Sequence, residues 1–147
     1  MSKRRFKLIA AVYLILIEKG KILLSKRYNT EYEDGKYSFI AGHVDGDETL
    51  RKALIREAHE EAGINISQED LNLIHIMHRN TDDPDNERLD FFFSANQYRG
   101  KIKNCEPQKC SEITWFALDD LPSNTIYYIR EAIKAIIDHK FYSEFNW

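Results

Sequence analysis

Aliphatic residues near the N-terminus form two runs that flank a short polar turn. Residues 8–17 and 22–27 are rich in Leu and Ile, and residues 18–21 between them include a glycine. Aliphatic runs around a glycine-containing turn are typical of a β-hairpin. A polar loop is predicted next, at residues 28–35, followed by a third short strand at residues 37–41.

Residues 49–62 have the pattern of an amphipathic helix with a signal at each end. Thr49 is a favourable N-cap, and Gly63 is a typical C-terminal stop. Apolar residues such as Leu54 and Ala58 recur on one side of this segment. The pattern predicts a helix that packs this side against a core.

Three more strands and a second helix are predicted in the C-terminal half. Residues 71–78 alternate apolar and polar positions, residues 89–98 include three consecutive phenylalanines, and residues 113–117 are largely apolar. Residues 126–141 have the spacing of an amphipathic helix. Strands precede and follow the first helix, so the fold class indicated is α/β.

Two remaining segments are expected to be structural rather than catalytic. The acidic residues in 80–87 are interpreted as turn residues, with a metal site as the alternative. The aromatic residues in 141–147 are too apolar to be wholly free, so we expect them to pack on the domain or across a dimer interface. The oligomer expected is a monomer or a homodimer.

Composition favours a single ordinary globular domain over residues 1–147. The sequence is 43% apolar and 31% charged, and its formal net charge is −3. The absence of a long basic run argues against a nucleic-acid polymer as partner, so a small-molecule substrate is expected.

The compartment expected from the sequence is the cytoplasm. Residues 1–17 resemble a signal peptide, but no small-residue cleavage site follows and the apolar run is too short to span a membrane. Cys105 and Cys110 are too few for a disulfide framework and lack partners at zinc spacing. We therefore expect ordinary thiols and no membrane partner.

Three glutamates on the first helix are the strongest chemical signal. Glu57, Glu60 and Glu61 lie within about 100° of each other on one helix face. Arg56 supplies a single compensating charge, and a bound cation would supply the rest. Oxygen ligands favour Mg²⁺ or Mn²⁺. The phosphates of a substrate commonly complete the coordination shell of such an ion. The alternative is a solvated helix face without a metal.

The same stretch resembles the Nudix box, Gly-x5-Glu-x7-Arg-Glu-U-x-Glu-Glu-x-Gly-U, where U is a bulky aliphatic residue. The matching positions within residues 42–64 are Gly42, Glu48, Arg56, Glu57, Glu60, Glu61, Gly63 and Ile64. Ala58 is the loose position, because the pattern asks for a larger side chain there. The resemblance implies a Nudix-type α/β/α sandwich with a mixed β-sheet.

The resemblance also implies roles for the box residues. Glu57, Glu60 and Glu61 would hold Mg²⁺, and Glu57 has a competing role as the base that deprotonates the attacking water. Arg56 would orient these carboxylates, and Glu48 would anchor Arg56. Gly42 and Gly63 would be structural.

Further metal ligands are implied outside the glutamate face. The backbone carbonyl of Ala41 can ligate a metal without using a side chain. The family commonly supplies a fourth acid from outside the box, for which Glu106 and Glu112 are the candidates. Glu112 is preferred because it directly precedes a predicted strand.

Three further positions resemble the MutT-type branch, in which they line the nucleotide pocket. They are Arg27, Phe39 and Asn124. The alternatives are a surface arginine, a core phenylalanine and a helix-capping asparagine. The chain departs from the branch at Ile40-Ala41, where a Pro-Gly pair is common, which makes substrate choice less transferable.

The activity implied is Mg²⁺-dependent hydrolysis of a nucleoside triphosphate to the monophosphate and pyrophosphate. An oxidised guanine nucleotide, 8-oxo-dGTP, is the first substrate to test, because an asparagine amide can pair with a purine edge. ADP-ribose or another nucleoside diphosphate derivative fits the same metal chemistry. A non-catalytic binding module is the alternative from a different class.

Overall fold

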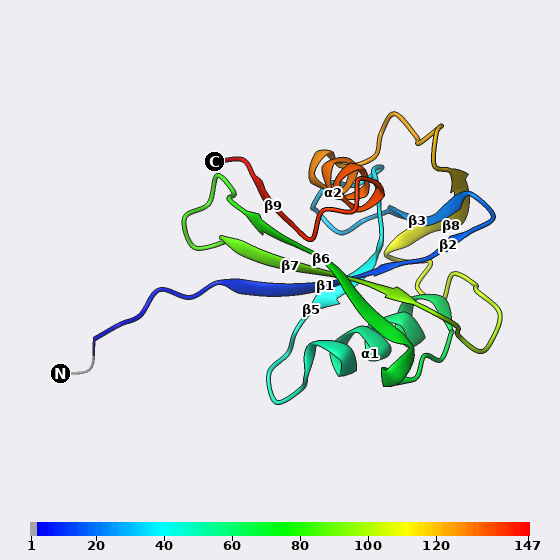
Figure 1. Ribbon diagram of the computed structural model, residues 1–147, viewed down its shortest axis with the longest axis horizontal. Coiled ribbons are helices and arrows are strands. Elements are labelled where there is room, and N and C mark those ends of the chain that lie inside the picture. The colour runs from blue at the N-terminus through cyan, green and yellow to red at the C-terminus, as the bar shows by residue number, and fades with distance from the viewer. Residues whose placement is uncertain (1–2) are drawn as a thin grey trace.

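Two helices and two β-sheets form the described part of this protein in a computed structural model (Figure 1). Residues 3–147 are described, so the first two residues of the predicted domain lie outside this range. The strands are β1 (Ile9–Ile15), β2 (Ile17–Glu18), β3 (Lys21–Arg27), β4 (Tyr37–Ser38), β5 (Ile40–His43), β6 (Leu71–Arg79), β7 (Arg88–Ala95), β8 (Cys110–Ala117) and β9 (Tyr142–Phe145). The helices are α1 (Leu50–Ala62) and α2 (Tyr127–Ile137), and a short 3₁₀ turn, η1, spans Gln68–Asp70.

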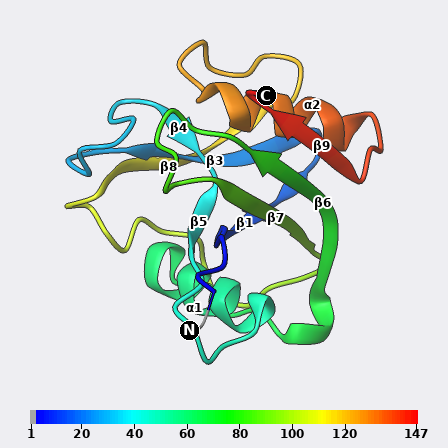
Figure 2. The same ribbon diagram turned by 90° about the vertical axis from the view of Figure 1, so that its left-hand side faces the viewer.

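The larger sheet is mixed and has the strand order β5-β1-β7-β6-β9. Strand β1 runs antiparallel to β5 and parallel to β7, and β9 runs parallel to β6. In the smaller sheet, β3 pairs antiparallel with β2, β4 and β8. Helices α1 and α2 lie on opposite sides of these sheets (Figure 2). The α/β/α sandwich with a mixed sheet is therefore confirmed, with a second small sheet in addition.

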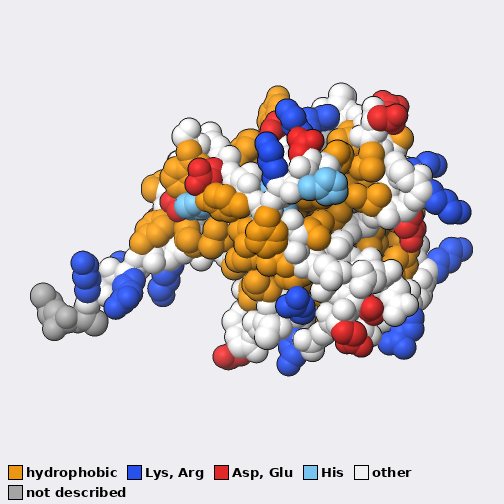
Figure 3. All heavy atoms as spheres, viewed as in Figure 1, with side chains coloured by type: hydrophobic (Ala, Val, Ile, Leu, Met, Phe, Trp, Pro, Cys, Tyr) orange, Lys and Arg blue, Asp and Glu red, His pale blue; other side chains and the backbone are white. Residues whose placement is uncertain are grey.

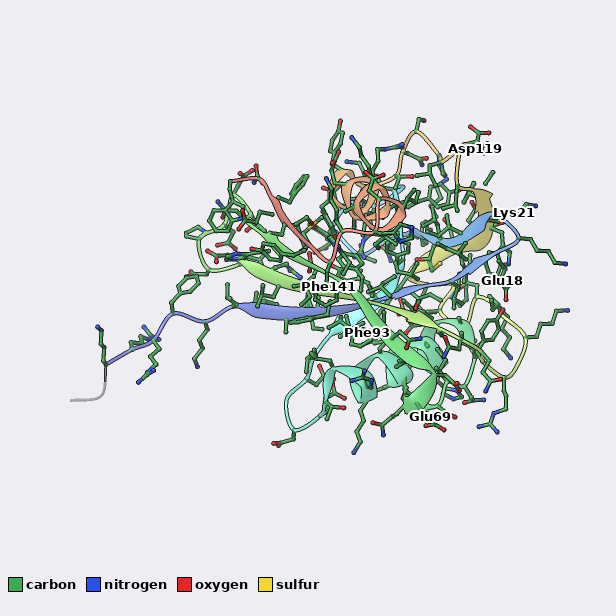
Figure 4. The ribbon with its side chains drawn as sticks, viewed as in Figure 1. Glu18, Lys21, Glu69, Phe93, Asp119 and Phe141 are labelled. Carbon is green, nitrogen blue, oxygen red and sulfur yellow. The ribbon has the colours of Figure 1, made fainter. Side chains whose placement is uncertain are left out.

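Two hydrophobic clusters hold the layers together, one toward each helix. Along β1, Ala11 and Tyr13 belong to the cluster that contains α2 residues, and Val12 and Leu14 belong to the cluster that contains α1 residues. Both faces of β1 are thus buried, which explains its continuous apolar sequence. Phe93 of β7 also belongs to the α1 cluster and lies between the sheet and α1 (Figure 4).

The predicted N-terminal hairpin is only partly correct. The turn forms where expected, with Glu18 and Lys21 paired at its end (Figure 4), but only β2 pairs with β3 in a hairpin. Strand β1 instead pairs with β5 and β7. An apolar run identifies a buried strand but not its partner, because partners are chosen by contacts far along the chain.

The C-terminal segment also differs from the prediction. Helix α2 ends at Ile137, earlier than residue 141, and β9 was not predicted. The tail packs back on the domain, the first of the two expectations for it. Strand β9 pairs with β6, and the indole N–H of Trp147 donates to the carbonyl of His78 at 3.0 Å.

Residues 3–8, before β1, form an extended arm that leaves the body of the molecule (Figure 1). Its basic side chains are exposed and stand away from the domain (Figure 3). None of the helices within residues 3–147 combines the length and the apolar character needed to cross a membrane.

Candidate active site

The absence of a side chain at Gly42 allows a carboxylate of α1 to pass the edge strand β5. A Cβ built at Gly42 would lie 2.2 Å from the Cδ and Oε1 atoms of Glu57. Real Cβ atoms do not approach other atoms this closely. Gly42 therefore serves to admit Glu57, rather than to provide an unusual backbone conformation.

A cavity of about 580 Å³ lies between the two sheets, and Glu57 and Glu61 of α1 line it. The wall also includes tyrosines from β1 and α2 and residues of β3 and β5. Its charged and aromatic lining residues are Glu57, Glu61, Glu106, Lys26, Arg27, Arg88, Lys109, Tyr13, Tyr32, Phe39 and Tyr128. Acidic, basic and aromatic groups thus meet in one cavity large enough for a nucleotide.

Arg56 connects the carboxylates at the edge of this cavity. Its NH1 donates to Oε1 of Glu57 at 2.9 Å, and its NH2 donates to Oε1 of Glu48 at 2.8 Å. Asp45 and Glu60 lie within 3.1 Å and 3.6 Å of the same guanidinium. Hydrogen bonds from Arg56 hold the pKa of Glu48 below its ordinary value. The structure thus places Arg56 where the predicted orienting role requires it.

Glu61 is the most strongly perturbed carboxyl group of the cavity. Burial raises its pKa well above the ordinary value, and the nearby charges of Glu57 and Glu106 raise it further. The backbone N–H of Ala41 donates to its Oε2 at 3.2 Å. The pKa of Glu57 is raised as well, mainly by burial. Carboxylates in this state gain stability from a bound cation.

The acid from outside the box that lines the cavity is Glu106, not the preferred candidate Glu112. Glu106 lines the cavity, whereas the exposed Glu112 accepts a hydrogen bond from the hydroxyl of Tyr37. The reason lies at the end of α1, where the carbonyls of Glu61 and Ala62 accept N–H groups from Cys105 and Lys103 at 3.0 and 3.1 Å. This docking brings the next residue, Glu106, beside the helix glutamates.

The predicted metal ligands do not all lie together in one cluster of side chains among residues 3–147. Within residues 3–147, no three His, Cys, Asp or Glu side chains are gathered closely enough to hold a metal ion by themselves. Glu60 is exposed and lies outside the cavity lining. Because Mg²⁺ commonly uses one or two carboxylates and completes its shell with phosphates and water, Glu57, Glu61 and the Ala41 carbonyl remain a chemically suitable donor set.

Arg27 and Phe39, both predicted to bind substrate, line the cavity. The Nε of Arg27 donates to the carbonyl of Tyr32 at 2.7 Å, and its guanidinium lies over the Tyr32 ring. Phe39 is a core residue as well, with its ring edge toward Phe92. Arg27 therefore also fixes the loop that forms one side of the cavity.

Asn124, the third predicted substrate residue, does not line the cavity. Its side-chain N–H donates to the carbonyl of Gly35 at 2.7 Å. It does not cap α2 either, because the N-cap position is Ile126 and carries no side-chain hydrogen bond. The observed contact joins the segment before α2 to the loop at residues 28–35.

Sequence patterns missed several residues of the cavity wall. Tyr13 and Tyr128 look like ordinary apolar positions of a strand and a helix, and Arg88 looks like a surface charge beside an acidic loop. Alternation does place Tyr13 on the same face of β1 as Ala11, so a shared wall was predictable once the strand's partners were known.

Comparison with known proteins gives a family match over most of the chain. The NUDIX domain family matches residues 6–138. The NAD-capped RNA hydrolase NudC of Shigella flexneri is 30% identical over 120 residues, which are 82% of this chain and 44% of that protein. The chain thus spans less than half the length of the curated relatives it matches.

Solved structures show the same fold. A MutT NUDIX hydrolase from Burkholderia pseudomallei superposes with a TM-score of 0.79 at 26% identity, covering 87% of this chain and 97% of that one. A MutT protein from Methanosarcina mazei Go1 gives 0.76 at 21% identity, covering 92% and 97%. The second likeness is evidence for the fold alone.

Proposed function

Because this chain belongs to the NUDIX domain family, we propose that it is a Mg²⁺-dependent hydrolase that splits a nucleoside triphosphate into the monophosphate and pyrophosphate. The observation that carries this proposal is the pair of partly buried glutamates, Glu57 and Glu61, which line one cavity together with basic residues. Acidic groups suit a cation, and basic groups suit the phosphates that accompany it.

Glu57, Glu61 and the carbonyl of Ala41 would hold the cation, with Mn²⁺ as a possible substitute. A bound divalent ion neutralises the phosphates and lowers the pKa of a water ligand. Arg56 holds one oxygen of Glu57, which leaves the other oxygen for the cation or for a proton of the attacking water. Glu106 adds a third carboxylate to the cavity lining.

The cavity suits a nucleobase through its aromatic lining residues. Tyr13, Phe39 and Tyr128 line it, and Tyr13 stacks on Phe92 at 4.6 Å between ring centroids. Aromatic rings bind planar bases by stacking and do not by themselves choose among them. Because the Asn124 side chain donates to Gly35, recognition of the base of 8-oxo-dGTP would depend on other polar groups of the cavity wall.

The test is a panel of substrates with product analysis. The panel contains 8-oxo-dGTP, dGTP, dCTP, dUTP, ADP-ribose and NAD, and NAD-capped RNA is added because the NudC relatives carry that name. We expect Mg²⁺-dependent release of pyrophosphate from a triphosphate. Turnover of ADP-ribose alone would move the proposal to a diphosphate substrate, and no turnover of any member would favour a binding module.

Substituting the glutamates tests the metal assignment. Glu57→Gln and Glu61→Gln should each lower turnover by several orders of magnitude while the fold persists, because each removes a carboxylate ligand of the cation. Without Mg²⁺ each variant should melt at a higher temperature than wild type, since like charges in the cavity no longer repel each other. Mg²⁺ should raise the melting temperature of wild type by more than it raises that of either variant. A Glu57→Gln protein with normal turnover would exclude Glu57.

A further inference from the structure

Arg88, at the start of β7, has an unpaired hydrogen-bond donor in the cavity wall. Its side chain lines the cavity, and its Nε is buried without a hydrogen-bond partner among residues 3–147. The other side-chain nitrogens are bonded, NH1 to Nε2 of His43 at 2.8 Å and NH2 to the side-chain oxygen of Asn86 at 3.0 Å. One N–H of a firmly held guanidinium is therefore left without an acceptor.

Other well-held arginines of the domain use this atom. The Nε groups of Arg27, Arg56 and Arg79 donate to the Tyr32 carbonyl, to Glu48 and to Asp90, at 2.7, 3.3 and 2.8 Å. An arginine that only stabilises the fold is expected to satisfy its buried donors, because a buried unpaired donor is destabilising. The exception at Arg88 therefore calls for an acceptor that arrives from outside.

The charge of Arg88 is also uncompensated by its partners. Imidazole and amide groups are its hydrogen-bond acceptors, whereas Arg56 and Arg79 are paired with carboxylates. A planar guanidinium matches the geometry of phosphate oxygens and carries its charge at any working pH. The chemistry thus favours an anionic acceptor, and phosphate in particular.

The position of Arg88 sets it beside the carboxylate end of the cavity. Its partner His43 directly follows Gly42, the residue that Glu57 passes. Arg27 reaches the same cavity from β3 of the smaller sheet. Arg27 and Arg88 thus approach the cavity from different sheets, and a polyphosphate bound near Glu57 would lie within the reach of Arg88.

We infer that Arg88 is a phosphate-binding residue that donates its Nε–H to an oxygen of the substrate's phosphate chain. This inference rests on the proposed function and deepens it. Position 88 lies outside the family pattern of residues 42–64, so Arg88 would add a phosphate contact to those made by the box residues. In this arrangement Arg88 would position the phosphates, and the carboxylates would hold the cation that acts on them.

Calorimetric titration with inorganic pyrophosphate, in a chelator and without divalent metal, tests this directly. Arg88→Gln should weaken pyrophosphate binding by about tenfold or more, because a charge-assisted bond is lost. Arg88→Lys should recover part of the affinity, since it keeps the charge without the planar fork. Arg99→Gln is the matched control, because Arg99 is exposed and lies outside the cavity lining.

Kinetics and melting separate this role from a structural one. In the active enzyme, Arg88→Gln should act mainly by raising KM. Its melting temperature should stay close to that of wild type, because removal of the unpaired buried donor offsets the loss of the hydrogen bonds to His43 and Asn86. Unchanged pyrophosphate affinity in Arg88→Gln would overturn the inference. So would the absence of any binding heat or melting shift for wild type in millimolar pyrophosphate.

The two proposals fail in different ways. If no nucleotide is hydrolysed but Arg88→Gln still weakens pyrophosphate binding, the hydrolase proposal fails and the phosphate site stands. If nucleotides are hydrolysed and Arg88→Gln binds pyrophosphate normally, the role of Arg88 alone is wrong.

Discussion

Arg56 links several carboxylates from outside the cavity lining. Its guanidinium bonds Glu48 and Glu57 and lies near Asp45 and Glu60. These bonds raise the Arg56 pKa above its ordinary value, with the hydrogen bond to Glu48 as the main cause. Such supporting contacts fix the orientation of the groups that do the chemistry.

Replacing Arg56 should therefore damage both stability and metal binding. Arg56→Ala should weaken Mg²⁺ affinity by about 10- to 100-fold, the usual cost of losing a residue that orients metal ligands. Arg56→Lys should recover only part of this, because lysine cannot bond two carboxylates with a planar fork. Mg²⁺ titration and thermal melting measure the two effects, and full affinity in the lysine variant would show that charge alone matters.

Gly42 allows a second test at single-residue scale. Gly42→Ala should displace Glu57, because the new Cβ would lie 2.2 Å from the carboxyl carbon. We expect turnover to be lost and the free energy of unfolding to fall by about 1–3 kcal/mol, as for other overpacked sites. Adding Glu57→Ala should restore stability but not turnover. A Gly42→Ala protein with normal activity would contradict this steric role.

The spacing of the box residues predicted that Glu57 and Glu61 face the same way, but not that Glu60 is exposed outside the cavity lining or that Glu106 lines the cavity. The three box glutamates lie on one helix, so their spacing determines how they face. Glu106 reaches them because residues 103 and 105 dock on the carbonyls at the end of α1, and nothing local to that loop signals the contact. Asn124 likewise bonds a glycine 89 positions away. Side chains placed by distant backbone contacts could not be assigned from sequence.

At the scale of elements, α1 is the part that sequence predicted most fully. Both end signals are local and both are used, since the Thr49 side chain accepts from the N–H of Lys52 and Gly63 adopts φ 70°. Strand pairing has no such local signal, and β1 pairs with β5 and β7 instead of β3. The helix that carries the glutamates was therefore predictable, and the walls facing it were not.

The N-cap of α1 should contribute measurably to stability. Thr49→Ala should lower the free energy of unfolding by about 1 kcal/mol, because it leaves an N–H of the first turn without its side-chain acceptor. Thr49→Ser is the matched control and should stay near wild type. Urea unfolding of the metal-free protein measures this change, provided that the dependence of the unfolding free energy on urea concentration is the same in all variants. Equal stability of the alanine and serine variants would mean that the hydrogen bond contributes little.

At the scale of the whole molecule, a buried ion pair within the larger sheet contacts α2 through the ring of Tyr128. Arg79 of β6 donates to Asp90 of β7 at 2.8 Å, and both side chains are almost fully buried. Tyr13 of β1 donates its hydroxyl to the other oxygen of Asp90, and the Arg79 guanidinium lies 3.7 Å from the ring centroid of Tyr128. Because Tyr13 and Tyr128 line the cavity, this network supports its inner wall.

Asp90→Asn tests how far the molecule depends on this network. The amide keeps the shape and still accepts from Tyr13, but it leaves Arg79 as a buried charge without its counter-ion, which should cost about 3–5 kcal/mol in the free energy of unfolding. Adding Arg79→Met removes that charge, so the double variant should be more stable than Asp90→Asn alone. Urea unfolding of the three proteins measures this coupling. If Asp90→Asn stays within about 1 kcal/mol of wild type, the pair does not stabilise the fold in the way that buried ion pairs usually do when one partner is lost.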